Sequence, residues 1–174
     1  MKNISKVIAI AAAVIAFSNT SFAQATATAS ASATIITPIS IAKNVDMTFG
    51  NIAVSASTGG TVVLAPAGTR TTGGAGGVTL PSTTGTVAGA DFTVSGQASY
   101  TYAITLPSST VSLSDGSGHT MDVTAFTSTP SSTGTLSSGG TQDLKVGATI
   151  TVIAAQTPGV YTNSTGVPVT VNYN

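Results

Sequence analysis

One histidine and five aspartates are the side chains of this sequence best suited to acid–base or metal chemistry, since it contains no cysteine and no glutamate. A Ser–His–Asp triad would need His119 together with Asp115 or Asp122. His119 directly follows the turn-rich Asp115–Gly118 stretch, where a solvated loop histidine is the ordinary outcome. One histidine without cysteine or glutamate does not make a four-ligand zinc site. The residues predict no enzyme, no catalytic residue, no metal site and no cofactor.

Two further motifs also favour structural explanations. The glycine run Gly73–Gly77 has no following Lys-Ser/Thr and precedes a strand rather than a helix, so it does not match a phosphate-binding loop. Tyr100 and Tyr102 could stack on a sugar, but their alternation with polar residues places them on the apolar side of a strand and favours core filling. No binding site for a small molecule is predicted from either motif.

The first 23 residues have the pattern of a cleaved signal peptide. Lys2 and Lys6 precede the apolar run Val7–Phe17, and Ser21 and Ala23 put small residues at the positions that signal peptidase reads. The apolar run is too short for a helix to cross a hydrocarbon core of about 30 Å. We therefore expect export to the periplasm, the cell surface or the medium, with no membrane span after processing.

The charge balance argues against nucleic acid as a partner. After residue 23 the chain carries three basic residues and five aspartates, a net charge of −2. Such a sparse and slightly acidic surface does not attract DNA, RNA or anionic lipid.

The composition and spacing from residue 35 to residue 174 predict a single all-β domain. Thr, Ser, Val and Gly are abundant, and short segments of alternating apolar residues are separated by Gly- and Pro-containing turns. About nine or ten strands are expected, with essentially no helix. This regular spacing indicates an antiparallel β-sandwich rather than a fold with crossover helices.

Residues 24–34 form a short segment with its own pattern. Alanines at odd positions alternate with threonines and serines at even positions. A flexible linker is one interpretation, and an extended arm that adds as a strand to another sheet is the other. The composition leaves both open.

The C-terminal stretch carries a clear strand pattern to the end of the chain. Val167, Val169, Val171 and Tyr173 share one side, and polar residues and Pro168 lie on the other. A strand that must pair at a chain end is unusual, because chain ends are normally frayed.

The order of motifs along the chain resembles domain-of-unknown-function family 4402, a group of secreted bacterial proteins. The resemblance runs from about Ile35 to Asn174, through the segments IITPISI, VDMTFGNIAV, GTVVLAPAGTR, DFTVSG, YTYAITLP and GGTQDLKVGATITV to QTPGVYTNSTGVPVTVNYN. Its most specific parts are Leu144–Val152 and Pro158–Tyr173.

The Pro-Gly-x-Tyr-Thr turn and the alternating strand that ends in Asn-Tyr are more distantly similar to the C-terminus of chaperone–usher pilins, including spore-coat-protein-U-like subunits. This likeness implies an immunoglobulin-like sandwich with a groove that a periplasmic chaperone, or another copy of the protein, fills by β-strand addition. It implies a strand-addition interface at Ile35, Ile36, Ile39, Val167, Val169, Val171 and Tyr173. The chain departs from many pilins in having no cysteine and in offering mostly alanine before Ile35.

Two functions follow as hypotheses. The first is a secreted structural subunit, pilin-like or located at the cell surface as part of a fimbrium, that assembles by strand addition. The second is a self-complete monomeric sandwich, an adhesin or a carbohydrate- or protein-binding module, that presents loops such as Thr71–Gly77 and Ser114–His119.

Overall fold

A computed structural model describes residues 24–174 of the protein, so the predicted signal peptide lies outside the described residues. Twelve strands and no helix are present in this part of the chain. The strands are β1 (Ser40–Val45), β2 (Ala53–Val54), β3 (Gly60–Leu64), β4 (Arg70–Gly73), β5 (Val78–Thr79), β6 (Ala90–Ser95), β7 (Thr101–Thr105), β8 (Val111–Ser114), β9 (Thr120–Thr129), β10 (Thr133–Thr135), β11 (Thr141–Val152) and β12 (Thr170–Tyr173).

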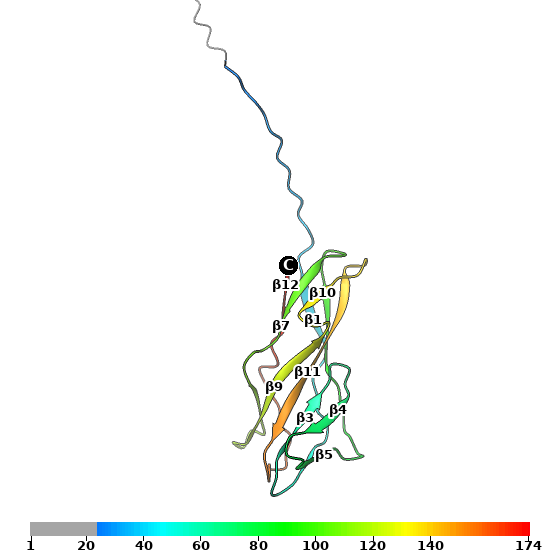
Figure 1. Ribbon diagram of the computed structural model, residues 1–174, viewed down its shortest axis with the longest axis vertical. Coiled ribbons are helices and arrows are strands. Elements are labelled where there is room, and N and C mark those ends of the chain that lie inside the picture. Colours follow the sequence, from blue (N-terminus) through cyan, green and yellow to red (C-terminus); the bar gives the residue numbers. More distant parts are fainter. Residues whose placement is uncertain (1–23) are drawn as a thin grey trace, which may run out of the picture. The chain divides into compact units, whose positions relative to one another are not determined.

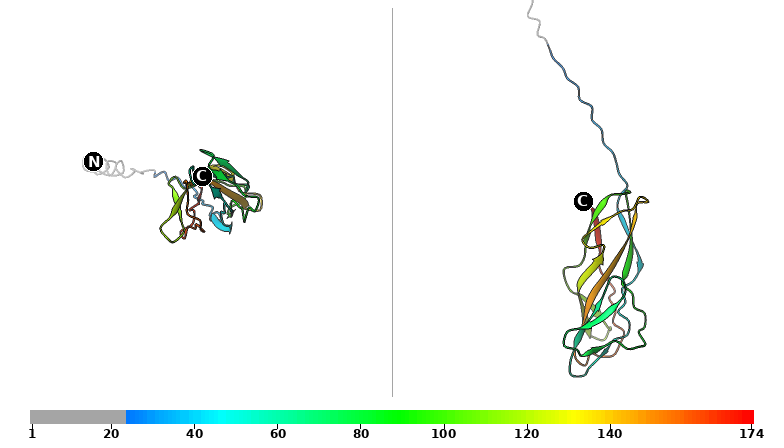
Figure 2. Two further views of the ribbon diagram at one scale, coloured as in Figure 1. Left: turned by 90° about the horizontal axis from the view of Figure 1, so that it is seen from below. Right: turned by 45° about the vertical axis from the view of Figure 1, so that its right-hand side comes forward.

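The twelve-residue strand β11 is the centre of a seven-stranded sheet (Figure 1). Along one edge its first half pairs with β6 and its second half with β3, which extends the sheet to β1 and β4. Along the other edge it pairs with β9, which in turn pairs with β8 (Figure 2). Every pairing is antiparallel, as the turn-rich sequence predicts.

Gly147 lies in β11 between the segments that pair with β6 and β3. A Cβ atom there would come within 2.2 Å of the carbonyl oxygen of Leu64. The chain of β3 leaves the sheet at this point, and only glycine leaves room for its backbone. A glycine in the middle of a long strand is thus explained by a close backbone approach.

Three strands form a second sheet in the order β10-β7-β12, and β2 and β5 form a two-stranded pair. In Figure 1, β7, β10, β12 and β1 are labelled in the upper part of the folded domain, and β5 is labelled near its lower end. Among the described strands, the C-terminal strand β12 pairs with β7 alone, so β12 is an edge strand of this sheet.

Alternating residues of these strands build two apolar clusters. The first cluster contains buried residues of β3, β9 and β11, with Phe49 and Val78. The second contains buried residues of β6, β7, β11 and β12, with Leu136. Tyr102 is fully buried in the second cluster, where its hydroxyl donates to Gln142 Oε1 at 2.8 Å, and burial raises the pKa of this hydroxyl.

The predicted antiparallel all-β fold is confirmed, and residues 24–174 contain no helix, as expected. The described residues form twelve strands rather than nine or ten, because pieces as short as the two-residue β2 and β5 also pair. No helix in the described part of the chain has the length and apolar character needed to cross a membrane.

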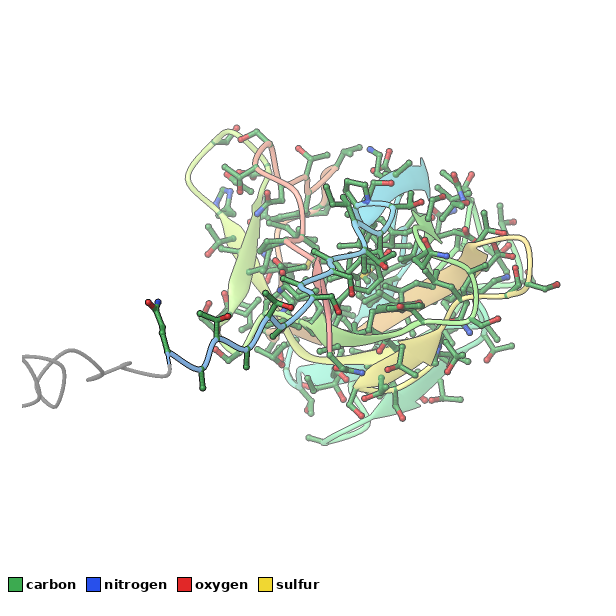
Figure 3. The ribbon with its side chains drawn as sticks, turned by 90° about the horizontal axis from the view of Figure 1, so that it is seen from above. Carbon is green, nitrogen blue, oxygen red and sulfur yellow. The ribbon has the colours of Figure 1, made fainter. Side chains whose placement is uncertain are left out.

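Contacts divide the chain after Ile35, and Ile36–Asn174 is one compact unit. Residues 24–35 contain no strand, and every side chain in this segment is exposed. These side chains point alternately to opposite sides of an extended backbone (Figure 3).

Adjacent valines of β3 test the two faces of this strand. Val62 is 0% exposed in the first cluster, and Val63 on the opposite face is 41% exposed. Val62→Ala should lower the free energy of unfolding by about 2 kcal/mol through lost burial and a residual cavity. The matched substitution Val63→Ala should cost less than about 1 kcal/mol. Urea unfolding of both variants measures the difference, and equal destabilisation would contradict the observed orientation of β3.

Candidate functional site

Asp115 and His119, the polar residues considered for acid–base chemistry, lie in a hairpin turn. Asp115 Oδ1 accepts hydrogen bonds from the main-chain N–H of Ser117 at 2.7 Å and of His119 at 3.1 Å. His119 Nδ1 lies 2.6 Å from Asp115 Oδ2, and the histidine side chain is about half exposed. Chiefly the hydrogen bond from Ser117 N–H holds the pKa of Asp115 below its usual value. This arrangement caps the hairpin between β8 and β9.

The other residues considered for metal binding or sugar stacking also do not gather into a site. Within residues 24–174, no three His, Asp or Glu side chains gather closely enough to hold a metal ion. Tyr100 is 45% exposed and packs edge-to-face on Tyr173, with ring centroids 5.8 Å apart. Tyr102 lies two residues further along, in β7, and is buried, so the two tyrosines do not form one stacking platform.

A small hollow of about 250 Å³ lies beside the ion pair of Lys145 and Asp91. Lys145 Nζ is 3.6 Å from Asp91 Oδ2, and the amide of Asn44 donates to the other oxygen of this carboxylate at 2.9 Å. The charged groups of the hollow are therefore already paired with one another.

The C-terminal strand β12 has one unpaired edge. Hydrogen-bonded and non-bonded residue pairs alternate along an antiparallel ladder. Asn174 N donates to Thr101 O at 3.4 Å, so Asn172 is the next residue of β12 that bonds β7. The main-chain groups of Val171 and Tyr173 consequently face the opposite edge, where no described strand pairs with β12.

The segment before β12 continues this one-sided pairing. Thr162 and Ser114 of β8 exchange two main-chain hydrogen bonds of 2.8 and 2.9 Å, and the Asn163 side chain donates to Ser112 O at 2.8 Å. Tyr161 closes the preceding loop, because its hydroxyl donates to Thr157 O at 2.8 Å. All these bonds lie on the β8 side or inside the loop, which leaves the other edge of the segment free.

A second one-sided edge runs from β1 through residues 46–54. β1 pairs with β6, and Thr48 and Ala88 then exchange hydrogen bonds of 2.9 and 3.0 Å. Arg70 of β4 holds the next turn from outside, since its Nη1 donates to the carbonyl oxygens of Phe49 and, at 2.8 Å, of Asn51. Gly50 between them has a φ of +65°, which favours glycine.

A groove of about 970 Å³ separates these two edges. Its walls are residues 46–54 on one side and residues 156–163 with Val167 on the other. Its floor consists of apolar side chains of the first cluster: Met47, Phe49, Ile52, Leu113, Met121, Val123, Ile150 and Val152. Asp46 is the one charged residue in the groove lining. The groove is therefore an opening into the apolar core between two strand edges.

The groove closes toward the end of β12. Cα atoms of β1 and β12 come within 8 Å of each other, and Ile39, Val169 and Tyr173 pack into the second cluster between them. The hydroxyl of Tyr173 donates to Thr37 O at 2.7 Å and accepts a hydrogen bond from Gln97 N. We call this arrangement the Tyr173 latch.

The residues expected at a strand-addition interface therefore lie in three places. Val167 lines the groove, whereas Ile39, Val169, Val171 and Tyr173 belong to the second cluster of their own chain. Ile36 is half buried, and Ile35 is 97% exposed in the preceding segment. The floor residues were not expected as a site, because Val45, Met47 and Phe49 alternate with polar residues as in any strand with one apolar side.

The described residues thus form an all-β protein of antiparallel sheets, with an apolar groove between two strand edges that are each paired on one side. A family model matches residues 39–173, and the chain belongs to this family, described as Domain of unknown function (DUF4402). The family expected from the order of motifs is confirmed. No curated protein and no solved structure matches the chain.

Arg70→Met tests what holds the outer wall of the groove. The variant keeps an apolar stem but loses the donors to Phe49 O and Asn51 O. Unfolding free energy should fall by about 1.5–3 kcal/mol, the usual contribution of hydrogen bonds from a charged group. Arg70→Lys should show an intermediate loss, because a lysine lacks the planar fork of donors. Wild-type stability of Arg70→Met in urea would show that the wall does not depend on these bonds.

Acid should open the hairpin turn at Asp115. A lowered carboxyl pKa means that the charged form stabilises the folded turn above the unfolded-state pKa of about 3.8. This contribution is lost as the pH falls through the lower folded-state pKa. Amide NMR signals of Ser117 and His119 should shift in that acidic range. In Asp115→Asn these acid shifts should disappear, and their persistence would assign them to another group.

Proposed function

We propose that this protein is an exported, non-enzymatic structural subunit that assembles by β-strand addition. The observation that supports the proposal is the groove between residues 46–54 and 156–167, which opens onto core side chains and lies between two half-paired edges. The groove would accept a strand from its partner, as in a pilin. The partner would be a second copy of the protein or a periplasmic chaperone.

The chemistry of the groove suits an extended chain better than a compact ligand. Main-chain groups on the groove side of each edge, such as those of Met47 and Tyr161, can bond an added strand, and an apolar floor favours alternate apolar side chains from that strand. Covering the floor adds about 25 cal/mol for each Å² of apolar surface removed from water. Met47 and Met121 give the floor side chains that adapt to different occupants.

The proposal includes a finer description of the fold. The sheets would form an immunoglobulin-like sandwich in which the strand between residues 46–54 and residues 156–167 is missing and is supplied by the partner. Export by the signal peptide of residues 1–23 accounts for an assembly outside the cytoplasm. The chain has no cysteine and hence no disulfide, and an added strand would cover the groove that opens onto its core.

Amide exchange tests the acceptor groove directly. The chain from Ile36 onward keeps all described strands and both apolar clusters, and it lacks the preceding segment. In this form Thr48 should be protected by Ala88 and Thr162 by Ser114, whereas the groove-lining neighbours Met47 and Tyr161 should exchange faster. Addition of an eleven-residue peptide of alternating Val and Thr should slow the exchange of Met47 and Tyr161.

The matched control is a peptide of the same composition with its valines in pairs, which puts apolar side chains on both faces of a strand. Equal effects of the two peptides would contradict strand addition. Full protection of Met47 and Tyr161 without any peptide, in a monomer, would favour the self-complete binding module instead.

A further inference from the structure

Two polar atoms in the groove lining have no hydrogen-bond partner. Among residues 24–174, Thr48 Oγ1 and Gln156 Oε1 are the two buried polar side-chain atoms that lack one. Thr48 belongs to the wall of residues 46–54, and Gln156 belongs to the wall of residues 156–163. Buried polar groups in folded proteins are almost always bonded, because burial removes them from water. Both missing hydrogen bonds thus belong to the groove.

The amide of Gln156 is held in one orientation. Its Nε2 donates to the Tyr161 hydroxyl at 2.8 Å and to Thr120 O at 3.3 Å. The Tyr161 hydroxyl donates its own hydrogen to Thr157 O, so it has none left for Gln156. Exchanging the amide nitrogen and oxygen would place Oε1 against Thr120 O, which is also an acceptor. Gln156 Oε1 is consequently a fixed acceptor that needs a donor from outside this loop.

Thr48 is held by its main chain and not by its side chain. Its main-chain N–H and C=O exchange hydrogen bonds of 2.9 and 3.0 Å with Ala88. Its hydroxyl bonds no group of the described residues. A hydroxyl rotates to suit its partner, so Thr48 can donate to an occupant of the groove or accept from one.

A charged occupant does not suit these two atoms. Asp46 is the one charged residue of the groove lining, and it already pairs with Lys43. The groove floor is apolar, and an unpaired charge buried on it would be costly. The group that complements Gln156 Oε1 is therefore a neutral hydrogen-bond donor.

We propose that Gln156 and Thr48 select partner strands in which a neutral hydrogen-bond donor, such as a threonine side chain, interrupts the apolar groove-facing side chains. This inference rests on the proposed function and names the residues that determine which strands the groove accepts. The donor of the partner bonds Gln156 Oε1, and Thr48 bonds a polar group of the partner at the opposite wall. A strand with only apolar groove-facing side chains leaves both atoms unpaired beneath it and binds more weakly.

Peptide binding to the chain of residues 24–174, measured by fluorescence anisotropy, tests this selection. The reference is the eleven-residue Val–Thr peptide with all its valines facing the floor. In the test series, threonine replaces one of these valines at a time. The best member of the series should bind about tenfold more tightly than the reference, since its hydroxyl pairs a buried acceptor. Members whose hydroxyl faces apolar side chains should bind more weakly than the reference.

Two substitutions in the groove should remove this preference. Gln156→Met removes the acceptor at a similar side-chain length, and Thr48→Val replaces the hydroxyl by a methyl group of similar size. Both variants should still bind the reference peptide, and the advantage of the best threonine peptide should be lost in Gln156→Met and reduced in Thr48→Val. The matched control is Thr149→Val, which lies outside the groove lining on the sheet face of the exposed Val63 and should keep the wild-type preference.

Thr48→Val has a second readout that needs no peptide. Replacing an unpaired buried hydroxyl by an apolar group of the same shape should raise the urea midpoint of the empty protein. Thr149→Val should leave the midpoint nearly unchanged. A lower midpoint for Thr48→Val would show that its hydroxyl is already paired in the free protein, which would overturn its role in selection. This readout decides alone if Gln156→Met disturbs its loop and loses the reference peptide as well.

The outcomes separate this inference from the proposed function. Binding of the reference peptide without tighter binding of any threonine peptide would overturn selection by Gln156 and Thr48 and leave strand addition in place. An unchanged preference in Gln156→Met would likewise overturn the role of this residue. If neither the reference nor any threonine peptide binds the wild-type protein, the proposed function is overturned together with the selection.

Discussion

The pairing of the C-terminal strand on one side only is the constraint on which the rest of the structure depends. β12 bonds β7, and its other edge meets no described strand. The opposite edge, from β1 through residues 46–54, likewise bonds only toward β6 and Ala88. The apolar side chains that line the groove between these edges belong to the first cluster; Val123, Ile150 and Val152 are buried beneath the partly buried Met47, Leu113 and Met121.

The two ends of this opening are closed by different means. At the β12 end, large side chains of the second cluster and the Tyr173 latch fill the space between the edges. At the other end, Arg70 and the bonds of Asn51 hold one wall outward, and the Thr162–Ser114 pair holds the other. The wide part of the groove is thus held by contacts on its outer sides, which leave its interior free.

Several features could be predicted from the residues alone. The alternation in β6, β11 and β12 correctly indicated strands with one buried side, because side chains in a strand point to opposite faces in turn. The hairpin turn at Asp115 was also evident from its turn residues.

The floor of the groove could not be predicted in the same way. Met47 and Phe49 have the same apolar alternation as residues in a closed core, and nothing local distinguishes an uncovered strand from a covered one. The expectation that Tyr100 and Tyr102 both fill the core was wrong for Tyr100 for a related reason. Tyr100 precedes β7 and is half exposed. Both outcomes depend on which segments come to lie beside these residues.

By itself the sequence determined the all-β class, the buried side of each regular strand and the small, uncharged character of residues 24–34. These properties follow from local chemistry, since period-two alternation and turn residues act within a few positions of the chain. Only the tertiary structure decided which edges lack a partner. Pairings such as Thr48 with Ala88 and Ser114 with Thr162 join residues about forty to fifty positions apart, and an edge is free only when every such pairing is known.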